Sequence, residues 1–228
     1  MGVIIGMDEA GYGPNLGPLV ITATVWDVPG SPHDVDLYEA FADVVDRASP
    51  ADGKIHIADS KQVYAPHKGL AALEQSVHTL LGLHEPPPAK LTQLWSRLIG
   101  GDIDVDACGP WLRDTDLDLP LCIESESAAA TSTRLRKCCD ERSIRLRAIV
   151  SEVVTPRAFN QLLDQYDSKG VLLSRLSMRL LSRVVDFDGG EPTLVIADKH
   201  GGRNRYDHLL EDIAGDHFIV RDAESRSV

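Results

Sequence analysis

The chain opens with the stretch Val3-Ile4-Ile5-Gly6-Met7-Asp8-Glu9-Ala10-Gly11-Tyr12-Gly13-Pro14. Its apolar part, residues 3–7, predicts a buried strand. The β-branched run Leu-Val-Ile-Thr-Ala-Thr-Val-Trp at residues 19–26 predicts a second strand. The glycine- and proline-rich link between the two runs is too short for a crossover helix. We therefore expect the two strands to be antiparallel neighbours.

Two acidic residues follow the first predicted strand. Asp8 and Glu9 come directly after a buried run, where a carboxylate is costly unless it binds something positive. Neighbouring strand residues point to opposite faces, so both carboxylates can reach one site only where the strand ends and the chain bends. Gly11 and Gly13 permit such a bend. The pair therefore predicts a cation site, and the alternative is a solvated strand end before a turn.

The same glycines invite a dinucleotide-binding interpretation, which the spacing excludes. Gly11, Gly13 and Gly17 are spaced G-x-G-x-x-x-G, whereas the dinucleotide motif requires G-x-G-x-x-G at the start of a helix. Here Pro14 intervenes and a β-rich segment follows.

A second acid repeats the first pattern further along the chain. Asp198 follows the apolar run at 193–197 and precedes Lys199-His200-Gly201-Gly202-Arg203. If the first strand and this one are parallel neighbours, Asp8, Glu9 and Asp198 converge, because functional groups gather at the carboxyl ends of adjacent strands. Three carboxylates suit Mg²⁺ or Mn²⁺, and two such ions would stabilise a phosphodiester displacement. The alternative for Asp198 is a strand-end residue that caps the next turn.

The triplet Asp59-Ser60-Lys61 is a third candidate. Lys61 suits a phosphate contact as a point charge, although a solvated lysine is the alternative.

The rest of the pattern predicts an α/β fold: a mixed sheet with antiparallel first strands, flanked by helices. We expect a single domain over residues 1–228, with a loop-rich insertion around 89–120. The first strand is expected over 3–7, and a helix or mixed insertion over 34–47. Further helices are expected over 66–81, 125–141, 158–166, 171–185 and 206–213, and further strands over 144–154, 192–197 and 217–220.

Composition bounds the function. The net charge of −12 argues against a generic nucleic-acid binder. Basic residues nevertheless cluster at 134–147, around Lys199, Arg203 and Arg205, and at every fourth residue from Arg175 to Arg183, and together they would form a local phosphate track. Each cluster alone is more often a solvated face.

The sequence contains no apolar run long enough to span a membrane, and its N-terminal residues, which lack a basic region, predict a core strand and not a signal peptide. The four cysteines form no C-x-x-C pair, which predicts reduced, mostly buried thiols and a cytoplasmic location. We expect a monomer with no membrane association.

These motifs together resemble the type-2 ribonucleases H. The opening is similar to the D-E-A-G-R-G-P…G-P-V-V start of that family, residues 59–61 to its D-S-K motif, and residues 194–198 to its V-L-I-D-G strand. Residues 159–185 are similar to its paired helices. The matches fall in the family's order from about Met1 to Asp198. The opening motif is specific, and the other motifs add mainly through their order.

The resemblance implies a ribonuclease H-like fold, two divalent ions (Mg²⁺ or Mn²⁺) and endonucleolytic cleavage of RNA in RNA–DNA hybrids. It implies that Asp8, Glu9 and Asp198 are metal-binding catalytic acids, and that Ser60 and Lys61 of the D-S-K motif contact the substrate. It also implies that the Gly11-Tyr12-Gly13 segment reads the ribose 2′-hydroxyl, which distinguishes RNA from DNA. Lys199, which the family pattern does not contain, is a further candidate for contact with the substrate strand, because it adds a cation beside the predicted metals.

The chain departs from the family pattern in three places. Tyr12 stands where the family has arginine, so the charge and the fork of a guanidinium are lost. The segment after Asp198 reads Lys-His-Gly-Gly-Arg instead of glycine. The family's fourth acid and the A-A-S…A-K helix after it have no clear counterpart. Asp222 and Glu224 are candidates for the acid by position, and we expect a chain that is truncated relative to the family.

Two alternatives remain open at this point. A non-catalytic nucleic-acid-binding relative would bind hybrid duplex without cleaving it. A metal-dependent phosphoesterase for a small substrate would suit the acidic composition.

Overall fold

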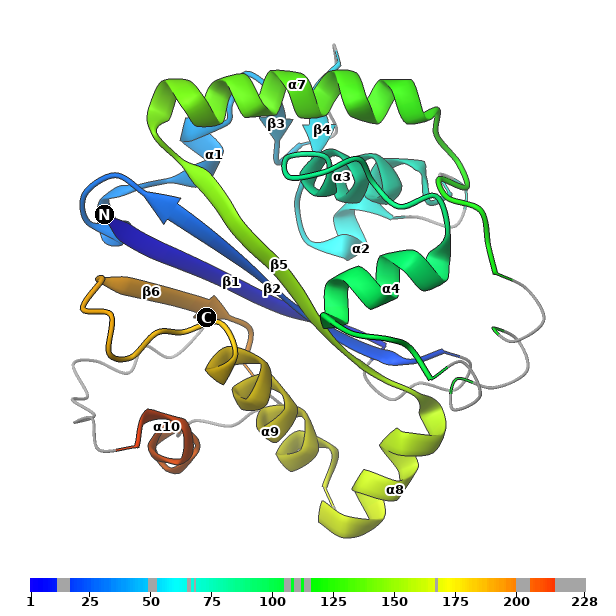
Figure 1. The fold of residues 1–228 in the computed structure, drawn as a ribbon, viewed down its shortest axis with the longest axis vertical. Helices are drawn as coiled ribbons and strands as arrows, with labels where there is room; N and C mark the ends of the chain where they lie inside the picture. The colour runs from blue at the N-terminus through cyan, green and yellow to red at the C-terminus, as the bar shows by residue number, and fades with distance from the viewer. Residues whose placement is uncertain are drawn as a thin grey trace.

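A four-stranded mixed sheet lies at the centre of the computed structural model (Figure 1). In spatial order its strands are β5 (Arg145–Val154), β2 (Leu19–Val28), β1 (Gly2–Ala10) and β6 (Thr193–Ala197). β1 pairs antiparallel with β2 and parallel with β6, and β2 pairs antiparallel with β5. The structure describes residues 1–11, 17–48, 53–64, 67, 69–104, 108, 112, 116–166, 168–199 and 206–215.

The first two strands pair as the short link predicts, but β1 is longer than expected. The sequence predicted a strand over 3–7 that stops before the acids. In the structure, Asp8, Glu9 and Ala10 continue the pairing, opposite Thr22, Ile21 and Val20. β2 runs far enough to pair with them, and backbone hydrogen bonding does not depend on side-chain polarity. The two acids therefore lie inside the strand and not at a bend beyond it.

One face of the sheet packs against two helices, α8 (Pro156–Tyr166) and α9 (Lys169–Ser182). Residues such as Ile5, Met7 and Ile21 point to this face and pack with buried leucines of α9. A third helix, α10 (Asp207–Ala214), packs against α9.

The other face packs against a separate apolar cluster. Ile4, Trp26 and Leu146 from the sheet pack with Leu135 of the long helix α7 (Ser125–Arg142). Phe41 follows the short helix α1 (Leu37–Ala40), and its ring centroid lies 5.5 Å from that of Trp26. This layer also contains β3 (Val45–Asp46), β4 (Ile55–His56), α2 (Ser60–Val63) and α3 (Ala71–Leu81), and α3 packs against α7 (Figure 1).

Three further expectations need correction or refinement. The helix expected from Pro66 begins at Ala71, because Gly69 has a positive φ of 69° just before it. The stretch 89–120, expected to be loop-rich, contains the nine-residue helix α4 (Leu91–Ile99). The stretch 34–47 is mixed: the 3₁₀-helix η1 (Pro32–Asp34) ends there, and α1 and β3 follow. The strand expected over 217–220 lies outside the described residues.

The architecture is thus mixed α/β, with helices on both faces of a mixed sheet. The four cysteines are free, and all but Cys122 are buried, as the sequence predicts. No helix in the described part of the chain is long and apolar enough to cross a membrane.

Candidate functional site

Two parallel strands bring the predicted acids to one edge of the molecule. In the register between β1 and β6, Met7 lies beside Ala197. The next residues along the two strands are Asp8 and Asp198, and both are exposed. The condition set by the sequence, that these strands be parallel neighbours, is therefore met. The carboxyl ends of adjacent strands place the two carboxylates at the same edge.

Asp8 and Glu9 point to opposite faces of the sheet, because both belong to a regular strand. Asp8 shares the face of Ile4, which α7 covers, whereas Glu9 shares the face of Met7, which α9 covers. The Asp8 Oδ1 accepts a hydrogen bond of 2.8 Å from the backbone N–H of the next residue, Glu9.

The Glu9 carboxyl has a raised pKa. Burial raises the pKa of the Glu9 carboxyl, and the negative charges of Asp8 and Asp198 raise it further, against the lowering effect of a backbone hydrogen bond. This effect shows that Asp198 is electrostatically coupled to Glu9 as well as placed beside Asp8. Asp8 and Asp198 therefore both lie close enough to Glu9 for their charges to disfavour its ionised form.

A polar row continues from Asp8 across the sheet. Thr22 lies opposite Asp8 on β2, and Ser151 lies opposite Thr22 on β5. The two hydroxyl oxygens of this pair are 2.9 Å apart, and Ser151 is fully buried. The sequence reasoning missed both residues. The sequence does show a hydroxyl residue in the middle of each of these largely apolar strands. Only the strand register, however, places Thr22 and Ser151 in line with Asp8.

On the opposite face, Glu9 belongs to a row that ends in an ion-pair cluster. Ile21 lies opposite Glu9, and Glu152 lies opposite Ile21 on β5. The Glu152 carboxylate binds Arg179 at 2.5 Å and Arg183 at 3.7 Å. Arg175, the third member of the predicted arginine face, instead lies over the ring of Tyr166 at 5.2 Å. The structure therefore uses these arginines to fasten α9 to the sheet and to its neighbours.

The basic segment 134–147 is also engaged within the protein. Arg134 donates to the backbone oxygens of Gly53 and Asp43, and Arg136 donates to that of Gly82. Toward the end of the segment, Lys137 and Arg142 pair with acids, and Arg145 and Arg147 bind the buried Asp27. These contacts weaken the expectation that the segment forms a phosphate track.

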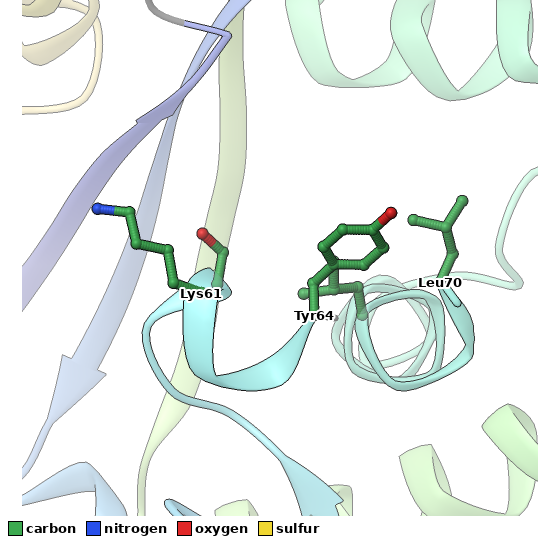
Figure 2. Close-up of a pocket in the computed structure, with 5 residues that line it drawn as sticks. Lys61, Tyr64 and Leu70 are labelled. Carbon is green, nitrogen blue, oxygen red and sulfur yellow. The ribbon is translucent and has the colours of Figure 1, made fainter. Parts of the chain in front are cut away.

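The Asp59-Ser60-Lys61 triplet forms the start of α2. The Asp59 carboxylate accepts a 2.8 Å hydrogen bond from the Lys61 backbone N–H, and this contact fixes the turn. The side chains of Ser60 and Lys61 are exposed and line a shallow pocket. Figure 2 shows Lys61 extending toward the strands of the sheet, away from Tyr64 and Leu70.

Of the predicted Gly11-Tyr12-Gly13 segment, the structure describes only Gly11. Its φ of 79° is a conformation that favours glycine, and a Cβ there would lie 2.6 Å from the backbone oxygen of Pro18. The position therefore requires glycine. Tyr12 and Gly13 lie outside the described residues, as do the candidate fourth acids Asp222 and Glu224. Lys199 follows Asp198 directly and is exposed.

The donor set of the site suits a hard divalent cation, because it consists of carboxylates. A cation among the three acids would also relieve the repulsion that raises the pKa of Glu9. Within the described ranges, however, no three His, Cys, Asp or Glu side chains already converge on one point. Because Asp8 and Asp198 are exposed, rotation of their side chains is the movement that would bring their oxygens together.

Comparison with family models, with curated proteins and with solved structures finds no match to this chain.

Proposed function

We propose that the chain is a metal-dependent endonuclease of the type-2 ribonuclease H kind, which hydrolyses the RNA strand of RNA–DNA hybrids. The observation that carries the proposal is the placement of Asp8 and Asp198 at the ends of adjacent parallel strands, with Glu9 coupled to Asp198. The motif resemblance of the opening segment supports the same activity. Four free cysteines are consistent with the cytoplasmic location that we propose for it.

In this proposal, Asp8, Glu9 and Asp198 would hold Mg²⁺ or Mn²⁺. When bound, such ions supply positive charge to the attacking and leaving oxygens of the scissile phosphodiester. The chain's own residues provide the rest: the sheet fixes the two strand ends, Lys199 and Lys61 place positive charge toward the backbone of the nucleic acid, and Gly11 lets the chain turn closely beside the substrate.

Cleavage of a labelled RNA–DNA hybrid tests the proposal. The wild-type protein is expected to cleave the RNA strand with Mg²⁺ or Mn²⁺ and to stop when EDTA is added. Asp8→Asn and Asp198→Asn are each expected to reduce the rate at least a hundredfold. Asp140→Asn, an exposed acid on α7, is the matched control and should cleave normally. Metal-dependent cleavage that survives both site substitutions would contradict the proposal.

A second candidate is a non-catalytic relative that binds nucleic acid. It is favoured by one observation, namely that the Asp8 Oδ1 is engaged by the Glu9 backbone N–H and that no three candidate metal ligands converge among the described residues. Saturable binding of hybrid duplex without cleavage at any tested divalent ion would support this second function against the first.

A further inference from the structure

A shallow pocket lies between α2 and α3, and only its Lys61 enters the function proposed above. It is open to solvent and has a volume of about 270 Å³, and its lining comes from α2, from α3 and from the residues that flank them: Ser60, Lys61, Tyr64, Leu70 and Leu73. In Figure 2 the ring of Tyr64 and the side chain of Leu70 lie next to each other, whereas Lys61 extends to the other side.

The wall of this pocket is apolar and open to solvent. Tyr64 is 41% exposed and Leu70 is 45% exposed, although both offer large apolar surfaces. Leu70, Leu73 and the 46% exposed Val77 are spaced i, i+3 and i+7, so they form one stripe on α3. Apolar side chains exposed along one stripe, next to an exposed aromatic ring, offer a binding surface that a single scattered apolar residue does not.

One end of the pocket carries a hydroxyl and a positive charge. The Ser60 and Lys61 side chains lie there, and no carboxylate in the described part of the chain pairs with the Lys61 ammonium group. The basic residues of 134–147 are engaged within the protein, so Lys61 differs from them. An unpaired cation at one end of the pocket and an aromatic ring at the other suit a ligand in which a phosphate adjoins a flat apolar ring.

The pocket also lies in the layer that covers the Asp8 face of the sheet. α2 and α3 belong to the layer that contains α7 (Figure 1), and Asp8 points to the face that this layer covers. A nucleic-acid strand held at Asp8 would therefore meet the same layer.

We propose that this pocket binds one unpaired nucleobase of a single-stranded segment of the nucleic acid. The base contacts the Tyr64 ring and the leucines, and Lys61 binds the adjoining phosphate. The inference rests on the proposed function, which brings nucleic acid to this edge. A protein partner would account for the apolar wall but not for the unpaired lysine at its end, so we favour the base.

The test compares two single-stranded DNA octamers, oligothymidylate and an abasic octamer of equal phosphate number. Affinity is measured by fluorescence anisotropy in EDTA. The wild-type protein is expected to bind the thymidine octamer about tenfold more tightly, which is typical of one stacked base. Tyr64→Ala and Leu70→Ala should remove most of that preference and leave abasic binding unchanged, whereas Tyr64→Phe should retain it.

Leu117→Ala is the control, because Leu117 is 40% exposed and does not line the pocket. Circular dichroism and thermal denaturation verify that each variant folds. Equal affinity of the wild-type protein for the two octamers would overturn the proposal. A Tyr64→Ala protein that loses affinity for both octamers by the same factor would also overturn it. Either result would leave a protein partner as the explanation for the apolar wall.

Hybrid cleavage by the same preparations separates this inference from the proposed function. Hybrid cleavage without a preference for the thymidine octamer would overturn only the proposal that the pocket binds a base. A preference for the thymidine octamer without hybrid cleavage would support base binding and overturn the proposed nuclease activity.

Discussion

Asp198 stands beside Asp8 because it continues the parallel register in which Ala197 lies next to Met7. These two acids are separated by most of the chain, yet a single strand pairing places them together. Glu9 points to the other face of the sheet, but its pKa is raised by its burial and by the negative charges of Asp8 and Asp198. The edge is therefore an acidic cluster whose repulsion a bound cation would remove.

Divalent ions should stabilise the folded protein through this cluster. An ion that binds only the native state at ten times its dissociation constant raises the free energy of unfolding by about 1.4 kcal/mol. For a chain of this length, that corresponds to an increase of about 3–5 °C in Tm. Differential scanning fluorimetry with Mn²⁺ or Mg²⁺ measures it. Asp8→Asn and Asp198→Asn should lose the shift, and Asp140→Asn should keep it. Equal shifts in all four proteins would place the ion elsewhere.

The buried ion pair at Asp27 should be a major contributor to stability. Asp27 is 2% exposed, and its carboxylate accepts hydrogen bonds from the guanidinium groups of Arg145 and Arg147. Burial alone would raise the pKa of Asp27, but these two arginines outweigh it and lower the pKa. Asp27→Asn is expected to cost about 2–3 kcal/mol at pH 7, because charged hydrogen bonds are lost.

The same substitution has a defined pH dependence. Since the folded pKa of Asp27 is lowered, its contribution is complete above the unfolded value of about 3.9 and is lost as the pH falls through the folded value. Denaturant unfolding at pH 7 and at acidic pH should therefore show the difference between wild type and Asp27→Asn shrinking with acid. Asp43→Asn, which breaks only an exposed pair with Arg142, should stay within about 0.5 kcal/mol. A pH-independent difference would contradict the assignment.

Two buried serines of α9 should respond in opposite directions to alanine. Ser177 is 2% exposed, and its hydroxyl has no hydrogen-bond partner among the described residues. Ser174 is fully buried, but its hydroxyl donates to the Gly170 backbone oxygen at 2.8 Å. Ser177→Ala is expected to stabilise the protein by about 1 kcal/mol, and Ser174→Ala to destabilise it slightly. Denaturant unfolding measures the free energy of unfolding of both variants. If Ser177→Ala loses more stability than Ser174→Ala, the Ser177 hydroxyl has a hydrogen-bond partner and the prediction is wrong.

The sequence was sufficient for the parts of the fold that depend on short-range rules. The short link required β1 and β2 to be antiparallel, and two acids after two apolar runs indicated a shared edge for Asp8 and Asp198. It misplaced the end of β1, because polarity marks where a side chain meets water and not where backbone pairing stops. That error matters, since it placed Asp8 and Glu9 at a bend instead of on opposite faces.

The contacts that sequence reasoning missed depend on register between distant segments. Thr22 meets Ser151 across 129 positions, and Glu152 meets Arg179 only because β5 and α9 pack in one particular alignment. The pocket at Tyr64 similarly requires α2 and α3 to pack together. No local pattern encodes these distances. The arginine spacing on α9 did predict a common face, but not the carboxylate that Arg179 and Arg183 bind.

Lys61 and Arg179 should differ in how they affect the binding of hybrid duplex. Lys61 has no carboxylate partner in the described part of the chain, whereas Arg179 is bound to Glu152. A side chain that neutralises one phosphate contributes about 0.9 to the slope of log affinity against log salt concentration, because it releases a counterion. Lys61→Gln should therefore reduce the magnitude of that slope by about one, and Arg179→Gln should leave it nearly unchanged. Anisotropy titrations in EDTA at four sodium chloride concentrations measure both slopes. Equal reductions would mean that Arg179 leaves Glu152 to bind phosphate, and would restore the phosphate track expected on α9.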